Sequence, residues 1–257
     1  MRIISYILLF VCFNITVNAQ AIKQKMPDNT SIDTTAKFRN ELFRKGNVSF
    51  GLKAGYTQSN IYGSDITYIF ADKKTNNLPS FHAGVLVNSM VGNFFWLKHE
   101  LLLVQKGAGV TLHDSINGNY SSTLKMLSLD LFPFSPAFHY KGFQIYAGPY
   151  ISGLLNASII RKDTLGNYFK DKSIYGSGSQ FENKSKYLQK IDFGINAGIE
   201  YQFPFGLFFG VKYKQGFTDI FQYANSYTFN DPKNTNIKIY NRSFLFSVGY
   251  SLVKLKK

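Results

Sequence analysis

The chain contains a single cysteine, Cys12, and a single tryptophan among its 257 residues. Cys12 lies in an apolar N-terminal segment that we expect to be removed, which would leave neither a disulfide nor a thiol nucleophile. Beyond that segment, no apolar run reaches the roughly 20 residues that a membrane-spanning helix requires. A membrane-spanning fold for this sequence would therefore have to be a β-barrel.

The first residues have the pattern of a secretory signal peptide. Arg2 precedes an apolar run over residues 3–13, and small residues near Ala19 form a cleavage site. We therefore predict a signal peptide over residues 1–19. Lipid attachment at Cys12 is the weaker alternative, because a valine precedes it where this processing needs a small residue.

The sequence is rich in aromatic residues and in positive charge. It has 25 Phe and 17 Tyr, and its 29 basic residues outnumber 15 acidic ones. Such an excess attracts anionic partners, among them nucleic acid and phosphorylated lipid. Nucleic-acid binding needs basic residues interleaved with aromatics on one accessible face. The basic residues here are scattered over the tails and one loop, so we expect no nucleic-acid partner.

A strict alternation of apolar with polar or glycine residues runs through Ile191–Phe203. Successive side chains of a strand point to opposite faces, so one face of this strand is wholly apolar. A short turn, Pro204–Gly206, leads into a second alternating segment, Leu207–Lys214. The pattern predicts a long antiparallel hairpin.

Eight strands are predicted in this way along the chain. They are Val48–Ser59, Ser80–Val91, Phe94–Gly109, Ser122–Phe134, Gly142–Ala157, Ile191–Phe203, Leu207–Gly216 and Arg242–Leu252. The connections after the second, fourth and sixth strands are short, and the middle one of these is Ser135–Lys141. The other connections are longer and polar.

Short turns at one end and long loops at the other are typical of outer-membrane barrels. We predict an all-β fold, an eight-stranded antiparallel up-and-down transmembrane β-barrel over residues 48–252. A flexible leader over residues 20–47 precedes it, and a basic tail over residues 253–257 follows. The leader enters on the side of the short turns, so both termini should be periplasmic in a Gram-negative cell envelope.

The alternation alone does not say which face points inward. A soluble lipocalin-like barrel would enclose the apolar face around a ligand, and a membrane barrel would turn it to lipid. Aromatic residues near both ends of the strands favour lipid, since membrane interfaces select two such belts. The belts are Phe50, Phe95, Phe143, Tyr201, Phe209 and Tyr250 on the turn side, and Tyr56, Phe81, Phe193, Phe217 and Phe244 on the loop side.

The polar face carries charges that balance. The mid-strand set has four lysines and four carboxylates: Lys53, Lys98, Glu100, Asp130, Asp192, Glu200, Lys212 and Lys214. Buried charges are tolerated when they are paired, so we predict an ion-paired lumen that plugs the barrel. Glu200 is expected to pair with a lysine of the next strand, with Lys212 the first choice.

Several segments resemble the PorT-like outer-membrane β-barrel family. They are Val48–Tyr56, Glu100–Gly107, Tyr146–Tyr150, Asp192–Gly194, Gly216–Ile220 and Ser247–Tyr250. Two segments depart from the family pattern: Ser128–Asp130 replaces an acid-Ile-Pro run, and the last strand ends on Tyr250-Ser251-Leu252 rather than Tyr-x-Phe. The resemblance implies an outer-membrane barrel without an assigned activity, and the family's namesake is associated with type IX secretion.

No catalytic or metal-binding motif is present. The four histidines, His82, His99, His113 and His139, lie on different segments without metal-ligand spacing. A paired-carboxylate site could be drawn from Glu100 and Glu200, but nearby lysines make structural ion pairing the better interpretation. We expect no cofactor and no enzymatic activity.

The segment Arg161–Lys186 is basic and contains aromatic residues. Its cations are Arg161, Lys162, Lys170, Lys172, Lys184 and Lys186. They could contact the phosphates of lipopolysaccharide, and a solvated loop is the equal alternative.

The sequence predicts a monomeric, non-enzymatic barrel with a structural, binding or accessory role at the cell surface or in a secretion system. Its partners would be outer-membrane lipid, the outer-membrane assembly machinery, and a surface or secretion-system protein. The alternative is a small ligand-binding barrel or a narrow channel.

Overall fold

The computed structural model describes residues 48–91, 94–175, 188–221 and 238–252. All of them belong to one compact unit, Gly46–Lys257. The predicted signal peptide, leader and C-terminal tail lie outside the described residues. Among the helices of the described part, none is long and apolar enough to cross a membrane.

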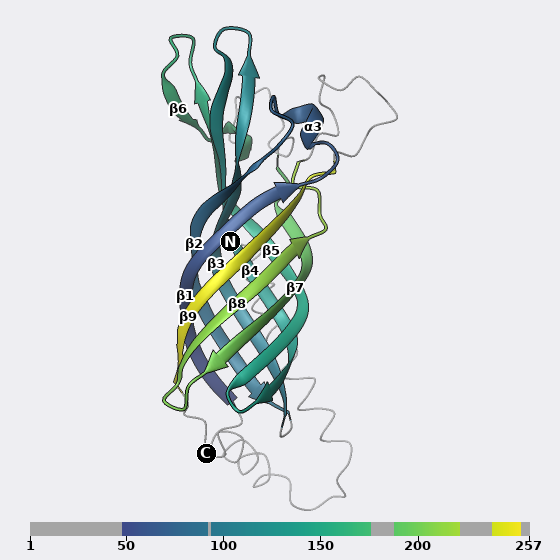
Figure 1. Ribbon diagram of the computed structural model, residues 1–257, viewed down its shortest axis with the longest axis vertical. Helices are drawn as coiled ribbons and strands as arrows, with labels where there is room; N and C mark the ends of the chain where they lie inside the picture. The colour runs from purple at the N-terminus through teal and green to yellow at the C-terminus, as the bar shows by residue number, and fades with distance from the viewer. Residues whose placement is uncertain (1–47, 92–93, 176–187, 222–237, 253–257) are drawn as a thin grey trace, which may run out of the picture. The chain divides into compact units, whose positions relative to one another are not determined.

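Eight long strands form a closed antiparallel ring (Figure 1). They are β1 (Val48–Tyr62), β2 (Asn76–Met90), β3 (Phe95–Asp114), β4 (Gly118–Tyr140), β5 (Phe143–Lys162), β7 (Ile191–Gln202), β8 (Leu207–Gly216) and β9 (Tyr240–Ser251). Sequential strands pair around the ring, and β1 closes it by pairing with β9. The predicted eight-stranded up-and-down barrel is confirmed.

Three short elements lie on the loop side. The strand β6 (Tyr168–Asp171) pairs with the end of β5, and α3 (Ile66–Ile69) and η1 (Ser173–Tyr175) are single turns. Apolar residues from the strand ends and these turns form a buried core there. It contains Ile61, Ile66, Phe70, Ala108, Val110, Leu124, Met126, Ala157, Ile159, Ile174, Leu188, Ile220, Phe221 and Ile239.

The apolar face of the strands points outward. Along β7 the odd-numbered residues from Ile191 to Ile199 are exposed and the even-numbered ones mostly buried, with Ile195 53% and Ile199 57% exposed. The same alternation runs through β9. An apolar outer wall around a polar interior suits lipid, so the lipocalin-like alternative is wrong.

The two predicted aromatic belts lie on this outer wall. Ten of the eleven belt residues are exposed, and the remaining one, Tyr201, is partly buried with its ring centroid 4.7 Å from that of Phe143. On the loop side, Tyr213 adds to the belt, with its ring 4.9 Å from Phe244. Aromatic residues are enriched at membrane–water interfaces, where their rings lie at the level of the lipid headgroups.

The strands are longer on the loop side than the sequence predicts. The expected long connection between the third and fourth strands is a paired hairpin, with only residues 115–117 between β3 and β4. Asp114 Oδ1 accepts the backbone N–H groups of Ile116 and Asn117, and Gly118 supplies a positive φ of 63°. The prediction ended the third strand at Gly109, but Val110 and Leu112 continue its apolar row, and Val110 is buried in the loop-side core.

The predicted turn at Ser135–Lys141 is also wrong. The strand β4 continues to Tyr140, and the turn is Lys141-Gly142, with φ values of 47° and 89°. Two left-handed residues match the twist of a two-residue hairpin. Pro133 and Pro136 of β4 occupy a stretch where the ladder to β5 is interrupted between Leu131 and Ala137. Proline is tolerated at such an irregularity.

Charge on the outer wall should be strongly destabilising. We expect Ile195→Lys to lower the free energy of unfolding by about 2–4 kcal/mol, because it places an ammonium group against lipid. The matched control is Leu165→Lys at the β5–β6 tip, where the side chain is 84% exposed and the change should stay within about 0.5 kcal/mol. Urea unfolding in liposomes measures both, and equal effects would contradict the assignment of the two faces.

Candidate functional site

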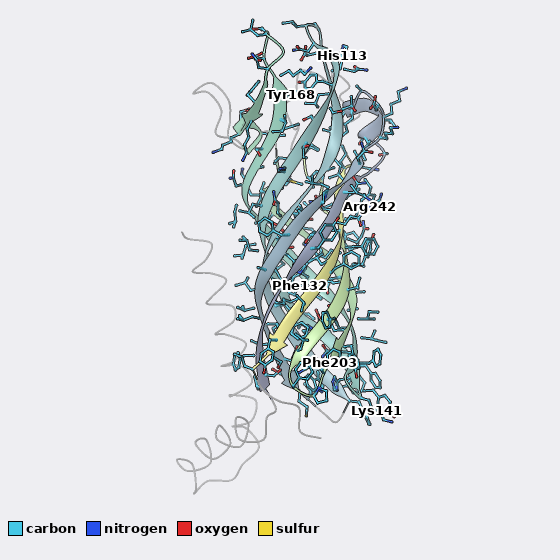
Figure 2. All side chains as sticks on the ribbon, turned by 60° about the vertical axis from the view of Figure 1, so that its left-hand side comes forward. His113, Phe132, Lys141, Tyr168, Phe203 and Arg242 are labelled. Carbon is cyan, nitrogen blue, oxygen red and sulfur yellow. The ribbon has the colours of Figure 1, made fainter. Side chains whose placement is uncertain are left out.

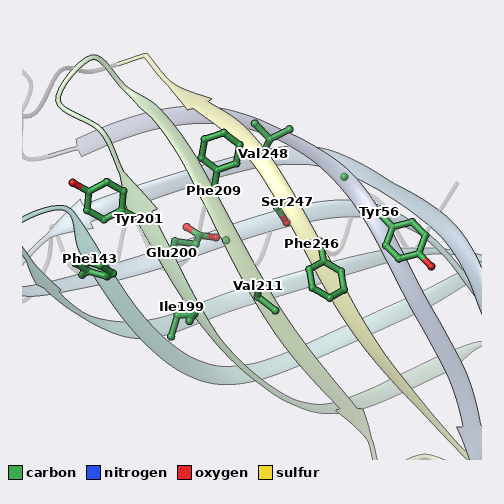
Figure 3. A pocket seen from close by; sticks show the side chains of 12 residues that line it. Tyr56, Phe143, Ile199, Glu200, Tyr201, Phe209, Val211, Phe246, Ser247 and Val248 are labelled. Carbon is green, nitrogen blue, oxygen red and sulfur yellow. The ribbon is translucent and has the colours of Figure 1, made fainter.

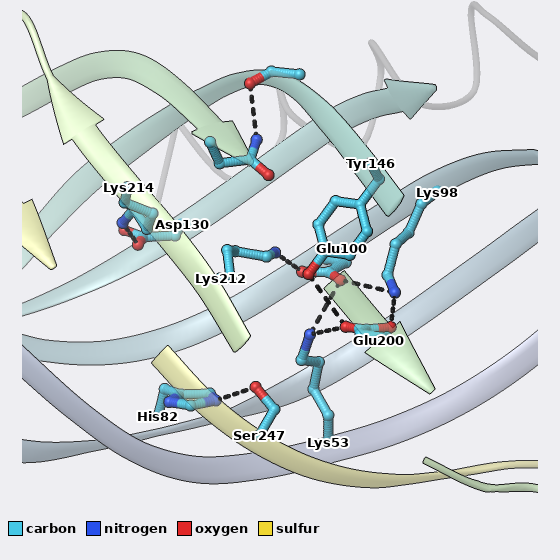
Figure 4. A network of polar contacts seen from close by, with 12 residues as sticks. Lys53, His82, Lys98, Glu100, Asp130, Tyr146, Glu200, Lys212, Lys214 and Ser247 are labelled. Carbon is cyan, nitrogen blue, oxygen red and sulfur yellow. Dashed lines mark hydrogen bonds and ion pairs between the residues drawn. The ribbon is translucent and has the colours of Figure 1, made fainter. Parts of the chain in front are cut away.

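All eight charged residues predicted for the lumen occupy inward positions and are less than a tenth exposed. They come from five strands: Lys53 from β1, Lys98 and Glu100 from β3, Asp130 from β4, Asp192 and Glu200 from β7, and Lys212 and Lys214 from β8. Figure 4 shows most of them crossing the barrel toward one another. The alternation of each strand is what turns these side chains inward.

Three lysines surround two carboxylates at the centre of the lumen. Lys53 Nζ lies 3.1 Å from Glu100 Oε1 and 3.0 Å from Glu200 Oε1. Lys98 is ion-paired with Glu200, and Lys212 with Glu100. Tyr146 donates its hydroxyl hydrogen to Glu200 over 3.1 Å. These bonds link β1, β3, β5, β7 and β8 across the lumen.

A second charged cluster contains Asp130 and Asp192. Lys214 pairs with Asp130, which also accepts a 3.0 Å hydrogen bond from the Ser128 hydroxyl. Lys106 Nζ lies 3.2 Å from Asp192 Oδ2, which further accepts bonds from the Tyr150 hydroxyl and the Asn241 amide. Each lysine of the lumen therefore has a carboxylate partner.

Lys106 was missed by the sequence analysis, although a signal existed. The inward row of β3 runs Trp96, Lys98, Glu100, and continues through Leu102 and Val104 to Lys106, which is 4% exposed. The prediction counted only mid-strand charges and so found a neutral set. With Lys106 included, five buried lysines face four buried carboxylates.

The expected pair of Glu200 and Lys212 does not form. Glu200 is opposite Gly210 in the ladder, and a Cβ on Gly210 would lie 2.2 Å from Glu200 Cγ, so the glutamate side chain covers that glycine. Lys212 instead crosses the lumen to Glu100 on β3. Closeness in sequence favours a partner on the neighbouring strand. An eight-stranded barrel is so narrow, however, that a lysine side chain also reaches the opposite wall.

Aromatic and apolar side chains fill the space between the two charged clusters. Lys212 Nζ lies 3.7 Å from the centroid of Phe132, and Lys214 Nζ 4.3 Å from that of Tyr150. Both rings belong to a buried apolar group with Leu102, Val104 and Leu245. A cation over an aromatic face is stabilised by the ring quadrupole. The lumen is thus packed with its own side chains.

Of the four histidines, His82 alone lies between hydroxyls in the lumen. Its Nδ1 is 2.9 Å from Thr57 Oγ1 and its Nε2 2.9 Å from Ser247 Oγ. His139 stacks on Trp96 with ring centroids 4.5 Å apart, and His113 contacts Asn119 in the β3–β4 hairpin. Within the described residues, no group of His, Cys, Asp or Glu is arranged to hold a metal ion.

The first part of the predicted basic loop is a hairpin of β5 and β6. Arg161 Nε pairs with Asp171 Oδ2 at 2.9 Å, and Lys162 Nζ lies 5.0 Å from the centroid of Tyr168 and 5.7 Å from that of Tyr120. Of the other predicted contact residues, Lys170 lies on β6 and Lys172 follows it. Lys184 and Lys186 lie outside the described residues.

The tip of that hairpin is closed by an aspartate. Asp163 Oδ1 accepts the backbone N–H groups of Leu165 and Asn167, at 2.9 Å and 2.8 Å, and Gly166 supplies a φ of 81°. The bond from the Asn167 backbone lowers the pKa of the Asp163 carboxyl below its ordinary value. Residues of this kind are the ordinary means of closing a tight turn.

A closed ring of eight antiparallel strands with an apolar outer wall defines an integral outer-membrane barrel. Residues 18–222 match the family model described as "Outer membrane protein beta-barrel domain". The chain belongs to this family, and it is an outer-membrane protein.

Several solved structures are similar to this chain. Ail of Yersinia pestis is 11% identical, with 79% of this chain and 98% of that chain covered and a TM-score of 0.41. Neisserial surface protein A is 12% identical, covering 81% and 99%, with a TM-score of 0.41. OprG of Pseudomonas aeruginosa is 14% identical, covering 80% and 96%, with a TM-score of 0.42. No curated protein matches the chain.

The pairing of Glu100 with Lys212 can be measured by a double-mutant cycle. Glu100→Gln leaves buried ammonium groups with less compensation, and such a loss costs about 3–5 kcal/mol. Combined with Lys212→Met, we expect the cost to fall short of the sum by about 0.5–3 kcal/mol, because the two groups are in contact. Urea unfolding of the four proteins in liposomes gives the coupling energy.

The control cycle uses Lys106→Met with Glu200→Gln, two residues that share no partner. Those two effects should add within about 0.5 kcal/mol. Equal coupling in both cycles would contradict the specific pairing.

Proposed function

We propose that this protein is a closed, non-enzymatic outer-membrane barrel whose wall anchors a binding surface on the loop side. The observation that carries the proposal is the filled lumen. Five buried lysines, four buried carboxylates and a layer of Phe132, Tyr150 and Leu102 occupy the interior. An eight-stranded barrel is only wide enough for its own side chains, so this interior leaves no path for a solute.

The binding surface would be built by the two hairpins on the loop side. β3 with β4, and β5 with β6, project beyond the ends of β7, β8 and β9 (Figure 1). His113 and Tyr168 lie at this end, opposite Phe203 and Lys141 (Figure 2). Binding residues are found disproportionately on loops that a rigid scaffold, such as a barrel, holds in place. We propose that this end faces the cell exterior and that both termini are periplasmic.

The proposed partners are molecules at the cell surface that carry anionic groups or that bind exposed aromatic side chains. Lys162 lies near the rings of Tyr120 and Tyr168, and Tyr168 and Leu165 are exposed. Such a mixture of cation and exposed aromatics favours contact with lipopolysaccharide or with a surface protein.

The motifs shared with the PorT-like family support an accessory role in a secretion system, and we propose that the chain acts there as a monomer. Cross-linking at Leu165 in native membranes, followed by identification of the attached chain, tests that role.

The purified protein should not conduct. In planar bilayers we expect no stable open channel, because every lumen cation is ion-paired and the layer around Phe132 is apolar. Correct folding of the sample is checked by a heat-dependent shift in gel mobility. Stable channels of porin size in the folded wild type would refute the closed barrel and revive the narrow-channel alternative.

The orientation can be tested with introduced cysteines, since Cys12 is the one native cysteine and lies in the predicted signal peptide. Leu165→Cys sits at the loop-side tip, where the native side chain is 84% exposed. We expect a membrane-impermeant maleimide to label it in intact cells. Phe205→Cys, on the opposite end and 54% exposed in the native residue, is the matched control and should react only after lysis. The reverse pattern would overturn the proposed orientation.

A further inference from the structure

Two basic side chains point outward where the apolar wall ends on the loop side. Arg242 is the first exposed residue in the outward row of β9, and Lys125 holds a corresponding outward position on β4. Both are exposed. Neither takes part in an ion pair within the described part of the chain, and β1, β8 and β9 contain no Asp or Glu at all. The wall around Arg242 is therefore positively charged and lacks a compensating carboxylate.

Arg242 is held in place by aromatic residues. The centroid of the Tyr62 ring lies 5.5 Å from the guanidinium carbon, and Tyr240 lies 5.6 Å from Tyr62. The Tyr62 hydroxyl donates to the Gly216 carbonyl at 3.2 Å, which fixes that ring against β8. Gln215, also outward, is the ladder partner of Arg242. The guanidinium is thus oriented by a ring face, and since its N–H donors have no hydrogen-bond partner among the described residues, they are left for a ligand.

The same wall is hollowed farther along toward the turn side. A groove of about 550 Å³ runs over β5, β7, β8, β9 and β1, and its apolar lining includes Tyr56, Val211 and Phe246 (Figure 3). Phe246 is the second outward residue after Arg242 on β9, about 14 Å along the strand at roughly 3.4 Å per residue. Between them lies Phe244, whose ring packs on Tyr213. Along β9 the outward side chains therefore change from the cation of Arg242 to the aromatic ring of Phe244 and then to the apolar groove at Phe246.

We infer that this wall is a binding site for lipopolysaccharide, with a lipid A phosphate on Arg242 and an acyl chain in the groove. The planar guanidinium fork matches a phosphate, and the bond is charge-assisted. A hydrocarbon chain in the apolar groove has a larger contact area with the protein than one on a smooth wall. The choice of lipopolysaccharide rests on the proposed function, because it requires the loop side to meet the outer leaflet.

Lys125 provides an internal control. In the ring, β4 lies four strands from β9 in either direction, on the opposite wall. Its exposed ammonium group has the same charge and lies at the same end of the barrel, but no aromatic ring and no part of the groove lies beside it in the described residues. General attraction to anionic lipid would involve both cations equally, and a specific site would involve Arg242 alone.

The test is a titration of the full chain in neutral detergent with lipid A, followed by native mass spectrometry of the bound lipid. Arg242→Gln should weaken binding about fivefold, the value of one cation at an anionic lipid surface. Arg242→Lys should recover part of that loss, and Lys125→Gln should change binding less than twofold. Val211→Trp, which fills the groove, should also weaken binding. Ile151→Trp, on the wall outside the groove, should not.

Equal losses for Arg242→Gln and Lys125→Gln would overturn the site in favour of general charge attraction. Phosphatidylglycerol bound as tightly as lipid A, with the same dependence on Arg242, would overturn lipopolysaccharide as the occupant. Each variant is first shown to be folded by its heat-dependent gel mobility, so a loss of binding is not a loss of fold. Failure of the proposed orientation would appear separately, as labelling of Phe205→Cys in intact cells.

Discussion

The ion pairs of Glu100 and Glu200 across the lumen are the contacts on which the rest of the structure depends. Glu100 meets Lys53, Lys98 and Lys212, which belong to three different strands, and Glu200 meets two of the same lysines. Charges so deeply buried are tolerated when each one has a partner. The network therefore holds opposite walls of the ring at a fixed distance. It also fills the middle of the barrel interior, together with the buried side chains around Phe132.

The narrow interior needs small residues beside the long ones. A Cβ on Gly198 would lie 2.5 Å from the Tyr146 hydroxyl oxygen, and one on Gly210 would meet Glu200. These inward glycines leave the volume that tyrosine, glutamate and lysine occupy. The outer wall has the opposite composition, with large apolar residues such as Ile195 and Phe209. One strand pattern thus produces both an ion-paired lumen and a lipid-facing wall.

Two ends of the barrel have different physical character. The turn side ends in short turns such as Lys141-Gly142 and in a dense group of aromatic rings around Phe203. The loop side continues into paired polar hairpins and an apolar core of its own. In the function that we propose, the filled lumen leaves recognition to the hairpins and to the wall near Arg242. Both surfaces combine an arginine or lysine with tyrosine rings, which suits phosphate-bearing or aromatic partners.

The sequence by itself determined the strand number, the antiparallel order and the eight lumen charges, because a period of two places Lys53 and Glu200 on the polar face regardless of the partner strand. It did not determine the pairing of Glu200, the inward position of Lys106 or the hairpins beyond Asp114. Pairing across a lumen depends on which walls face each other, and that follows from closure of the ring. Toward their tips the hairpins consist of polar residues such as His113, Asp114 and Asn119, so the alternation that predicts a strand fades there. Arg242 likewise acquired its tyrosines and its groove only when β9 paired with β1 and β8.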